Sequence, residues 1–243
     1  MKKIMAVVVG IMLITMALTG CGKKSALVGK VVDGKGNAMA GVKVVAKQVQ
    51  PIKGYEQFEA TTGSDGGFKF DKLFPTSAYE LITYPDGTTK KLSIKTESGP
   101  EGQTKTLPEP ITVRFQFSKD GATALDMKTG LMWAKDVNIA GGKMNWGQAM
   151  GVVSGLDIGG HKGWRLPNKM ELEQLAKSAG KEKPADYLNA IGFSNVQASW
   201  YWSSTPYEFD SSSAWGVSMD VGGVSNGLNK GYNGSVWPVR SGQ

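Results

Sequence analysis

Cysteine and histidine, two residue types that often perform nucleophilic and acid–base chemistry, are scarce in this chain. The 243 residues include one cysteine, Cys21, and one histidine, His161. Because Cys21 has no second cysteine to pair with, the chain can form no internal disulfide. His161 lies in a glycine-rich loop string, where a lone histidine is more often solvated or bonded to a carbonyl group. Counting residues leaves serine–histidine–acid catalysis open, but no nucleophile-elbow string supports it.

The carboxylates of the second half show no arrangement that is diagnostic of catalysis. Glycoside cleavage needs two carboxyl groups on either side of one bond. The spacing of the candidates indicates no such pair; they are Asp157, Glu171, Glu173, Asp210 and Asp220. We therefore expect a protein that is not an enzyme, without a cofactor or a metal site. An envelope hydrolase is the weakest of the alternatives.

A polar and aromatic stretch near the C-terminus is the best candidate for contact with a ligand. Residues 207–233 are rich in serine, glycine, asparagine and tyrosine and poor in lysine. Such mixtures make adaptable contact surfaces, as in antibody loops; plain solvated loops are the alternative. The candidate ligand-binding residues are Tyr207, Phe209, Asp210, Ser218, Asp220, Ser225, Asn226, Asn229, Tyr232 and Asn233.

The N-terminus reads as an export signal rather than as part of a fold. Two lysines precede an uncharged apolar run, which is short for a bilayer span and has the layout of a secretory signal. Its end, Leu18-Thr-Gly-Cys21, resembles the lipobox of bacterial lipoproteins. The resemblance implies a signal peptide over residues 1–20 and a lipid on Cys21 that anchors the chain in a membrane. An uncleaved anchor with an incidental cysteine is the alternative.

Charge and tryptophan are unevenly distributed along the chain. The net charge is +7, with 15 Lys+Arg against 11 Asp+Glu in residues 22–121 and 11 against 10 in residues 122–243. Nothing resembles the clustered basic face of a nucleic-acid-binding protein, so we expect no nucleic-acid partner. All seven tryptophans lie from Trp133 onward. The partition predicts two domains built on different rules, with the function in the second.

Residues 27–117, which follow a tether at 21–26, read as short strands and turns. Phe68 and Phe70 share a face at period two, and no stretch has helical periodicity. This pattern predicts an all-β sandwich. Its last strand is expected at 111–117, approached through a stiff Pro-Glu-Pro string at 108–110. Asp65 is expected to form an Asx turn rather than to bind a metal.

The same stretch resembles a known family. The strings Gly29-Lys-Val-Val-Asp33, Ala40-Gly-Val-Lys-Val44 and Thr62-Gly-Ser-Asp-Gly-Gly-Phe-Lys-Phe70 are similar to those of carboxypeptidase-regulatory-like, or transthyretin-like, domains. Such domains are usually spacers or adhesion modules, so the resemblance implies a non-catalytic β-sandwich stalk.

Residues 122–243 mix strand and helix patterns. Strands are expected within 124–133 and at 200–204, 214–219, 223–226 and 236–240. Two helices are expected where Asn145 precedes Gln148 and where Asn168 precedes Glu171, because both pairs have capping-box spacing. A short apolar turn is expected at 187–191.

Large and charged side chains of this half are expected to be structural. Trp133, Trp164, Trp202 and Trp237 are core candidates. Arg165 and Arg240 are expected to bridge buried carbonyls or a carboxylate.

Five strings in order, among them Gly163-Trp-Arg-Leu-Pro-Asn168 and Tyr201-Trp-Ser-Ser-Thr205, resemble a bacterial family whose best-known member is the C-terminal domain of a collagen-like adhesin. The resemblance covers residues 122–241 and implies an α+β C-type-lectin-like fold. The tail from Tyr201 to Arg240 is also similar to the variable region of retroelement-diversified lectin-like proteins. The calcium-binding strings of sugar-binding lectins are missing, so a calcium-bridged sugar is not expected.

These observations predict a membrane-anchored lipoprotein that displays a lectin-like binding module on a β-sandwich stalk. The expected partners are the membrane and an extracellular or periplasmic glycan or protein. Gly22 follows the lipid-bearing cysteine, where some bacteria place an aspartate as an inner-membrane retention signal. This favours the outer membrane or cell surface. The competing hypothesis is a structural envelope protein that docks onto a partner protein.

Overall fold

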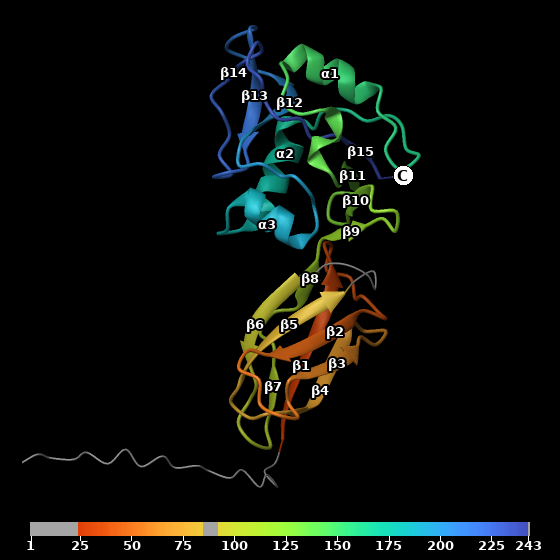
Figure 1. The fold of residues 1–243 in the computed structure, drawn as a ribbon, viewed down its shortest axis with the longest axis vertical. Helices are drawn as coiled ribbons and strands as arrows, with labels where there is room; N and C mark the ends of the chain where they lie inside the picture. Colours follow the sequence, from red (N-terminus) through yellow and green to blue (C-terminus); the bar gives the residue numbers. More distant parts are fainter. Residues whose placement is uncertain (1–23, 85–91, 243) are drawn as a thin grey trace, which may run out of the picture.

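The computed structural model describes residues 24–84 and 92–242 (Figure 1). The expected signal peptide and Cys21 lie outside these residues. Within the described part of the chain, no helix is long and apolar enough to cross a membrane.

The first domain consists of two four-stranded sheets packed face to face. One sheet has β1 (Ser25–Asp33) at its centre, flanked by β4 (Gly67–Leu73) on one side and by β7 (Thr104–Thr106) and β8 (Ile111–Val113) on the other. The second sheet has the order β3 (Gln57–Thr61), β2 (Lys43–Gln48), β5 (Ala78–Tyr84) and β6 (Leu92–Glu97).

The core of this sandwich follows from alternation along the strands. Leu27 and Val31 of β1 are buried together with Phe68 and Phe70 of β4 against Leu81 of the second sheet. Successive side chains of a strand point to opposite faces, so the residues between them remain available to solvent. The expected β-sandwich is therefore present.

The expected Asx turn is present at the β3–β4 connection. The backbone N–H of Gly67 donates to Asp65 Oδ1 at 2.9 Å. Gly66 has a φ of +73°, and a Cβ at this position would lie 2.5 Å from the carbonyl oxygen of Val31. Glycine is thus required here both by conformation and by the close approach to β1.

The strand expected at 111–117 is divided between the two domains. β8 pairs with β1, whereas β9 (Phe115–Phe117) pairs with β10 (Thr123–Asp126) of the second domain. The rings of Phe115 and Phe117 lie 5.2 and 5.3 Å from that of Phe193. Burial of these two rings in the second core explains why the strand changes sheets at Arg114 rather than after Phe117.

The second domain has two small sheets and three α-helices. Its first sheet has the order β15 (Val239–Ser241), β11 (Leu131–Ala134), β10 and β9, and its second has β12 (Trp200–Pro206), β13 (Ser213–Ser218) and β14 (Leu228–Asn229). The helical elements are η1 (Val137–Ala140), α1 (Trp146–Ser154), α2 (Lys169–Ala176), η2 (Lys177–Ala179) and α3 (Pro184–Ile191).

Both expected capping boxes are confirmed. Asn145 accepts from the backbone N–H of Gln148 while the Gln148 side chain accepts from the N–H of Asn145. Asn168 and Glu171 make the same pair of bonds at α2. Each box satisfies two N–H groups that would otherwise lack partners at a helix start.

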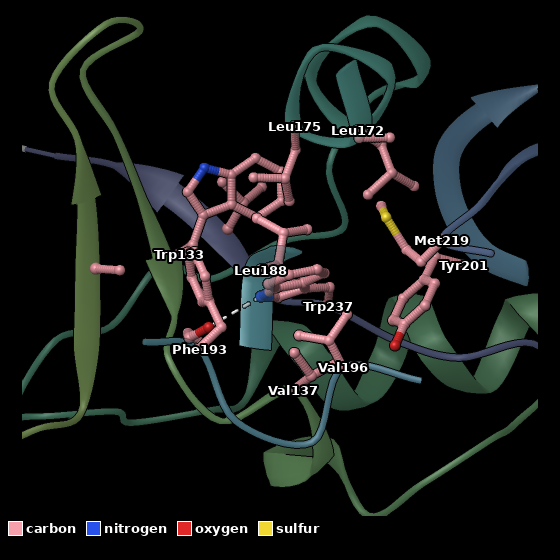
Figure 2. Close-up of a cluster of buried hydrophobic side chains, with 14 of the residues drawn as sticks. Trp133, Val137, Leu172, Leu175, Leu188, Phe193, Val196, Tyr201, Met219 and Trp237 are labelled. Atoms are coloured by element: carbon pink, nitrogen blue, oxygen red, sulfur yellow. Dashed lines mark hydrogen bonds between the residues drawn. The ribbon is translucent and has the colours of Figure 1, made fainter. Parts of the chain in front are cut away.

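The four tryptophans expected in the core are all buried. Trp133 and Phe193 meet Trp237 with ring centroids 5.7 and 5.1 Å away, both edge to face (Figure 2). The Trp237 indole donates to the carbonyl oxygen of Ala134 at 2.9 Å. Trp164 and Trp202 likewise donate to backbone carbonyls, so burial costs these polar groups little.

Two expectations for the second domain are wrong in detail. The segment at 187–191 is not a turn but the end of α3, which Pro184 opens at the first helical position. Residues 223–226 form only an isolated bridge to β13, and the third strand is instead Leu228–Asn229. The chain reaches this pairing two residues later because Gly227 turns with a φ of +89°.

Candidate ligand-binding surface

Three aromatic rings form a patch at the β12–β13 hairpin. The ring of Tyr207 lies 5.5 Å from Phe209 and 4.8 Å from Trp215, both edge to face. Phe209 is 80% exposed, and the other two rings are half-buried. We call these three residues the aromatic patch. Among the described residues, Phe209 is the most exposed of the large hydrophobic side chains.

The hairpin loop that carries Phe209 is shaped by Asp210. This carboxylate accepts from the hydroxyls of Ser213 and Ser212 at 2.7 Å each and from the backbone N–H of Ser212 at 2.9 Å. These bonds, that from Ser213 foremost, hold the pKa of Asp210 below its ordinary value. The carboxylate of Asp210 therefore orders the loop, which positions Phe209 beside it.

Charged groups of both signs border the aromatic patch. The ammonium of Lys169 lies 3.5 Å from the centroid of the Trp215 ring, a cation–π geometry. The Trp215 indole donates to Glu208 Oε2 at 2.8 Å. The backbone N–H of Glu208 and then this indole hold the pKa of the Glu208 carboxyl below its ordinary value. Trp215 is thus fixed in place by one cation and one anion.

The β13–β14 connection lies against Tyr207. A Cβ on Gly227 would lie 2.7 Å from the Tyr207 ring, so only glycine lets the backbone pass this close. Asn226 and Asn229, on either side of Gly227–Leu228, are exposed. Their amide groups are therefore placed near the aromatic patch.

The segment after β14 adds a second, smaller aromatic surface. Tyr232 is 46% exposed, and its ring stands edge to face on Trp202 at 6.4 Å. The Asn229 side chain accepts from the N–H of Gly231, and Asn233 is exposed. Lys230 lies 4.7 Å over the Trp146 ring and donates to the carbonyl oxygen of Ser211. Lys230 thereby links this segment to the hairpin loop.

The structure brings most of the expected site residues together, but not all of them. The residues at this end of the second sheet are Tyr207, Phe209, Asp210, Asn226, Asn229, Tyr232 and Asn233.

Ser218, Asp220 and Ser225 are exceptions. Ser218 and Ser225 are both buried. Ser218 accepts from the N–H of Asp220 in the turn after β13, and Ser225 accepts from the N–H of Gly216 on β13, so both have structural roles. Asp220 lies beyond the opposite end of β13, where it pairs with Lys183 at 3.0 Å.

Trp215, Lys169 and Glu208 are the members of the surface that the sequence did not single out. For Trp215 the sequence does hold a signal, because its neighbours Ala214 and Gly216 are small. Both neighbours are buried in the structure. Alternation along a strand then turns Trp215 outward. Lys169 reaches the ring from the first turn of α2, a contact distant in sequence.

Arg165 binds a carboxylate, as expected. Its guanidinium donates to both oxygens of Glu171 at 2.7 Å and to the carbonyl of Leu166 at 3.1 Å. Burial of Glu171 opposes ionisation, but the bonds from Arg165 and from the N–H of Asn168 outweigh it and lower the pKa of Glu171. The pair ties the Trp164–Asn168 segment to α2 and is structural.

The serine, histidine and carboxylate that could support hydrolysis, namely Ser118, His161 and Asp120, are not part of the aromatic patch. Ser118 donates to Asp120 Oδ1 at 2.5 Å, and its oxygen accepts from the N–H of Thr123, which is the bonding of a turn. His161 contributes only slightly to the lowering of the Asp120 pKa, which comes first from the Ser118 hydroxyl. The backbone carbonyl of His161 accepts from the Trp164 indole. Among residues 24–84 and 92–242, no three His, Cys, Asp or Glu side chains are grouped so that they could hold a metal ion.

The fold and the patch together define the second domain as a small α+β module with an exposed aromatic surface. Residues 122–240 match the family model described as the Lcl C-terminal domain. The match supports the family resemblance of the strings in this half of the chain. No curated protein matches the chain in sequence.

Several solved structures resemble parts of the chain at low identity. (S)-Allantoin synthase is 16% identical, with a TM-score of 0.30 over 37% of this chain and 42% of its own. A DUF3823 family protein from Parabacteroides merdae is 23% identical, with a TM-score of 0.28 over 46% and 56%. A fimbrial protein from Bacteroides ovatus is 13% identical, with a TM-score of 0.29 over 89% and 70%. The chain spans about half the length of the first two, and likenesses this weak carry no argument about function.

Proposed function

We propose that this protein is a lipid-anchored component of the bacterial cell envelope that binds a ligand through the aromatic patch and does not catalyse a reaction. The observation that carries the proposal is the exposure of Phe209 beside Tyr207 and Trp215. Leaving three clustered rings at the surface costs solvation free energy, which a ligand that covers them recovers.

A glycan is the ligand class that the patch fits best. Apolar faces of sugar rings stack on aromatic rings, while their hydroxyls need donors and acceptors at the rim. Lys169, Glu208 and the amides of Asn226 and Asn229 supply both. Because the bordering charges are of both signs, binding should depend on stacking and hydrogen bonds and only weakly on salt.

We further propose that the second domain is C-type-lectin-like. Two capped helices, the antiparallel strands β10 and β11, and a last strand that returns beside β11 support this proposal. In the same proposal the first domain is a spacer. The start of β1 and the β12–β13 hairpin lie at opposite ends of the molecule, so a lipid at Cys21 would hold the patch away from the membrane (Figure 1).

The test is a glycan-array screen of the chain from residue 24, followed by titration of the best ligand. We expect Tyr207→Ala and Phe209→Ala each to weaken binding by at most about 1.5–3 kcal/mol, the range for full burial of one large apolar side chain. Affinity should change little as salt is raised.

The matched control is Val221→Ala, because Val221, 73% exposed against 80% for Phe209, lies at the other end of β13. It should bind as the wild type does, and all variants should keep the wild-type circular dichroism. If Val221→Ala abolishes binding while Tyr207→Ala and Phe209→Ala do not, the site lies at the Val221 end of β13 and the proposed location is wrong. Affinity that collapses in modest salt would indicate a basic site instead.

A further inference from the structure

The end of the β-sandwich from which the chain begins carries an apolar surface. Val49 is 50% exposed, Ile52 and Tyr55 are partly exposed, and all three lie on the β2–β3 connection. Lys24, the first described residue, extends its ammonium to 4.4 Å from the centroid of the Tyr55 ring. We call Lys24, Val49, Ile52, Lys53 and Tyr55 the basal face. The start of β1 and the β2–β3 connection, which carry these residues, lie at the end of the sandwich away from the second domain (Figure 1).

The basal face is held in place by the sandwich. The buried side chain of Gln48 accepts from the backbone N–H of Ile52 at 2.8 Å, and the N–H of Tyr55 donates to the carbonyl of Ile52 at 2.9 Å. The Tyr55 ring packs edge to face on Phe74 at 5.1 Å. These contacts keep Val49 and Ile52 at the surface, since the loop cannot fold them into the core.

The first described residues are attached to the same end. The carbonyl of Lys24 accepts from Gly102 at 3.1 Å, and the N–H of Ala26 donates to Gln103 at 2.9 Å. Only two residues separate Lys24 from Cys21. At about 3.5 Å per residue, the Cα atoms of Cys21 and Lys24 are at most about 10 Å apart.

From these constraints we infer that the basal face rests on the phospholipid bilayer, with Val49, Ile52 and Tyr55 at headgroup depth. The inference rests on the proposed lipidation of Cys21. A lipid at Cys21 places the bilayer within about 10 Å of this end, which is comparable to the thickness of the headgroup layer. Aliphatic side chains beside a tyrosine and lysines match the interfacial layer, because rings and long basic side chains are amphipathic.

The charges of the basal face and its surroundings do not favour one class of lipid headgroup over another. Lys24 and Lys53 are balanced by Glu56 and Glu101 on the neighbouring loops and by Glu97 at the end of β6. Attraction to anionic headgroups therefore contributes little, and the contact depends on the tether and on apolar burial.

The test uses the lipidated full-length mature protein, in which the sulfur of Cys21 is blocked by lipid. Val49→Cys then supplies the only free thiol, which is labelled with an environment-sensitive fluorophore. The matched control is Lys35→Cys, an exposed position after the other end of β1. Both proteins are inserted into phosphatidylcholine vesicles, with or without phosphatidylglycerol, that contain headgroup-nitroxide lipids.

The expected result is strong quenching of the label at Val49, none at Lys35, and no dependence on phosphatidylglycerol. Ile52→Asp in the Val49→Cys protein should reduce the quenching toward the level at Lys35. Vesicle flotation separates the two possible failures. Protein that floats but shows equal, weak quenching at both positions overturns the basal contact alone, whereas protein that does not float overturns the lipid anchor and the contact with it.

Discussion

At the scale of single residues, the tryptophans of the second domain have two different roles. Trp133, Trp164, Trp202 and Trp237 are fully buried and support the core. Trp215 lies outward on β13, between Lys169 and Glu208. Residue type alone does not distinguish these roles. The distinction comes from the small neighbours of Trp215, which leave the inner face of the strand to Ala214 and Gly216.

The Arg165–Glu171 pair gives a pH-dependent prediction. The pKa of Glu171 is lowered in the folded state, so its ionised form stabilises the fold. This stabilisation is fully present above the ordinary pKa of glutamate and is lost as pH falls through the lower folded-state value.

We expect Glu171→Gln to unfold at a lower temperature than the wild type at neutral pH. The difference should narrow as the pH approaches 3, below the ordinary glutamate pKa of about 4.3. Thermal unfolding followed by tryptophan fluorescence at several pH values tests this. A difference that stays constant down to the acid limit would contradict a stabilising role for the ionised pair.

At the scale of elements, the sequence predicts the features that depend on residues close together in the chain. The capping boxes of α1 and α2 depend on residues three apart, so Asn145–Gln148 and Asn168–Glu171 were readable in advance. The sandwich strands around Leu27 and Phe68 were readable from alternation. Of the three rings of the aromatic patch, Tyr207 and Phe209 could be named from composition alone.

The features that the sequence did not predict depend on contacts between residues far apart in the chain. β3 is an edge strand of mixed polarity, and β7 and β8 pair in parallel with β1 across long connections. Nothing local in residues 111–117 indicates that Phe115 belongs with Phe193 of the second core. The cation–π contact of Trp215 likewise depends on Lys169, which approaches from α2.

The helix start after the Gly163–Asn168 string gives a second prediction. Asn168→Ala removes the bond that the N–H of Glu171 donates to Asn168 Oδ1 and should cost about 1 kcal/mol. Trp164→Ala empties a buried ring position and should cost about 3–5 kcal/mol. Urea unfolding monitored by circular dichroism tests both.

Lys181→Ala is the control, because Lys181 is exposed in the loop before α3 and should be nearly neutral. Negligible effects of both Asn168→Ala and Trp164→Ala would mean that this string is an exposed loop.

At the scale of the whole molecule, Arg114 joins the two domains. Its guanidinium donates to both oxygens of the buried Asp126 at 3.0 and 2.7 Å and to the carbonyl of Gln174 at 3.1 Å. Met127, in the turn after β10, packs against the core of the sandwich. The junction is therefore built from specific contacts rather than from a free linker.

The division of strand 111–117 predicts where the second domain can be cut. A fragment of residues 115–243 keeps β9 and should unfold cooperatively. A fragment of residues 122–243 loses the rings of Phe115 and Phe117 and should be less stable by about 3 kcal/mol or more. Urea titration with tryptophan fluorescence compares them, since every tryptophan is present in both. Equal stability would mean that β9 contributes nothing to the second core.

The placement of β9 and β15 has a consequence for engineering. They form the two edges of one four-stranded sheet, so the chain enters and leaves the second domain about 15 Å apart, at about 4.8 Å per strand spacing. A cassette with such closely spaced ends can be grafted into a surface loop of an unrelated scaffold without stretching the host. The same geometry suits circular permutation, in which a short linker joins residue 242 to residue 115 and new ends open in an exposed loop.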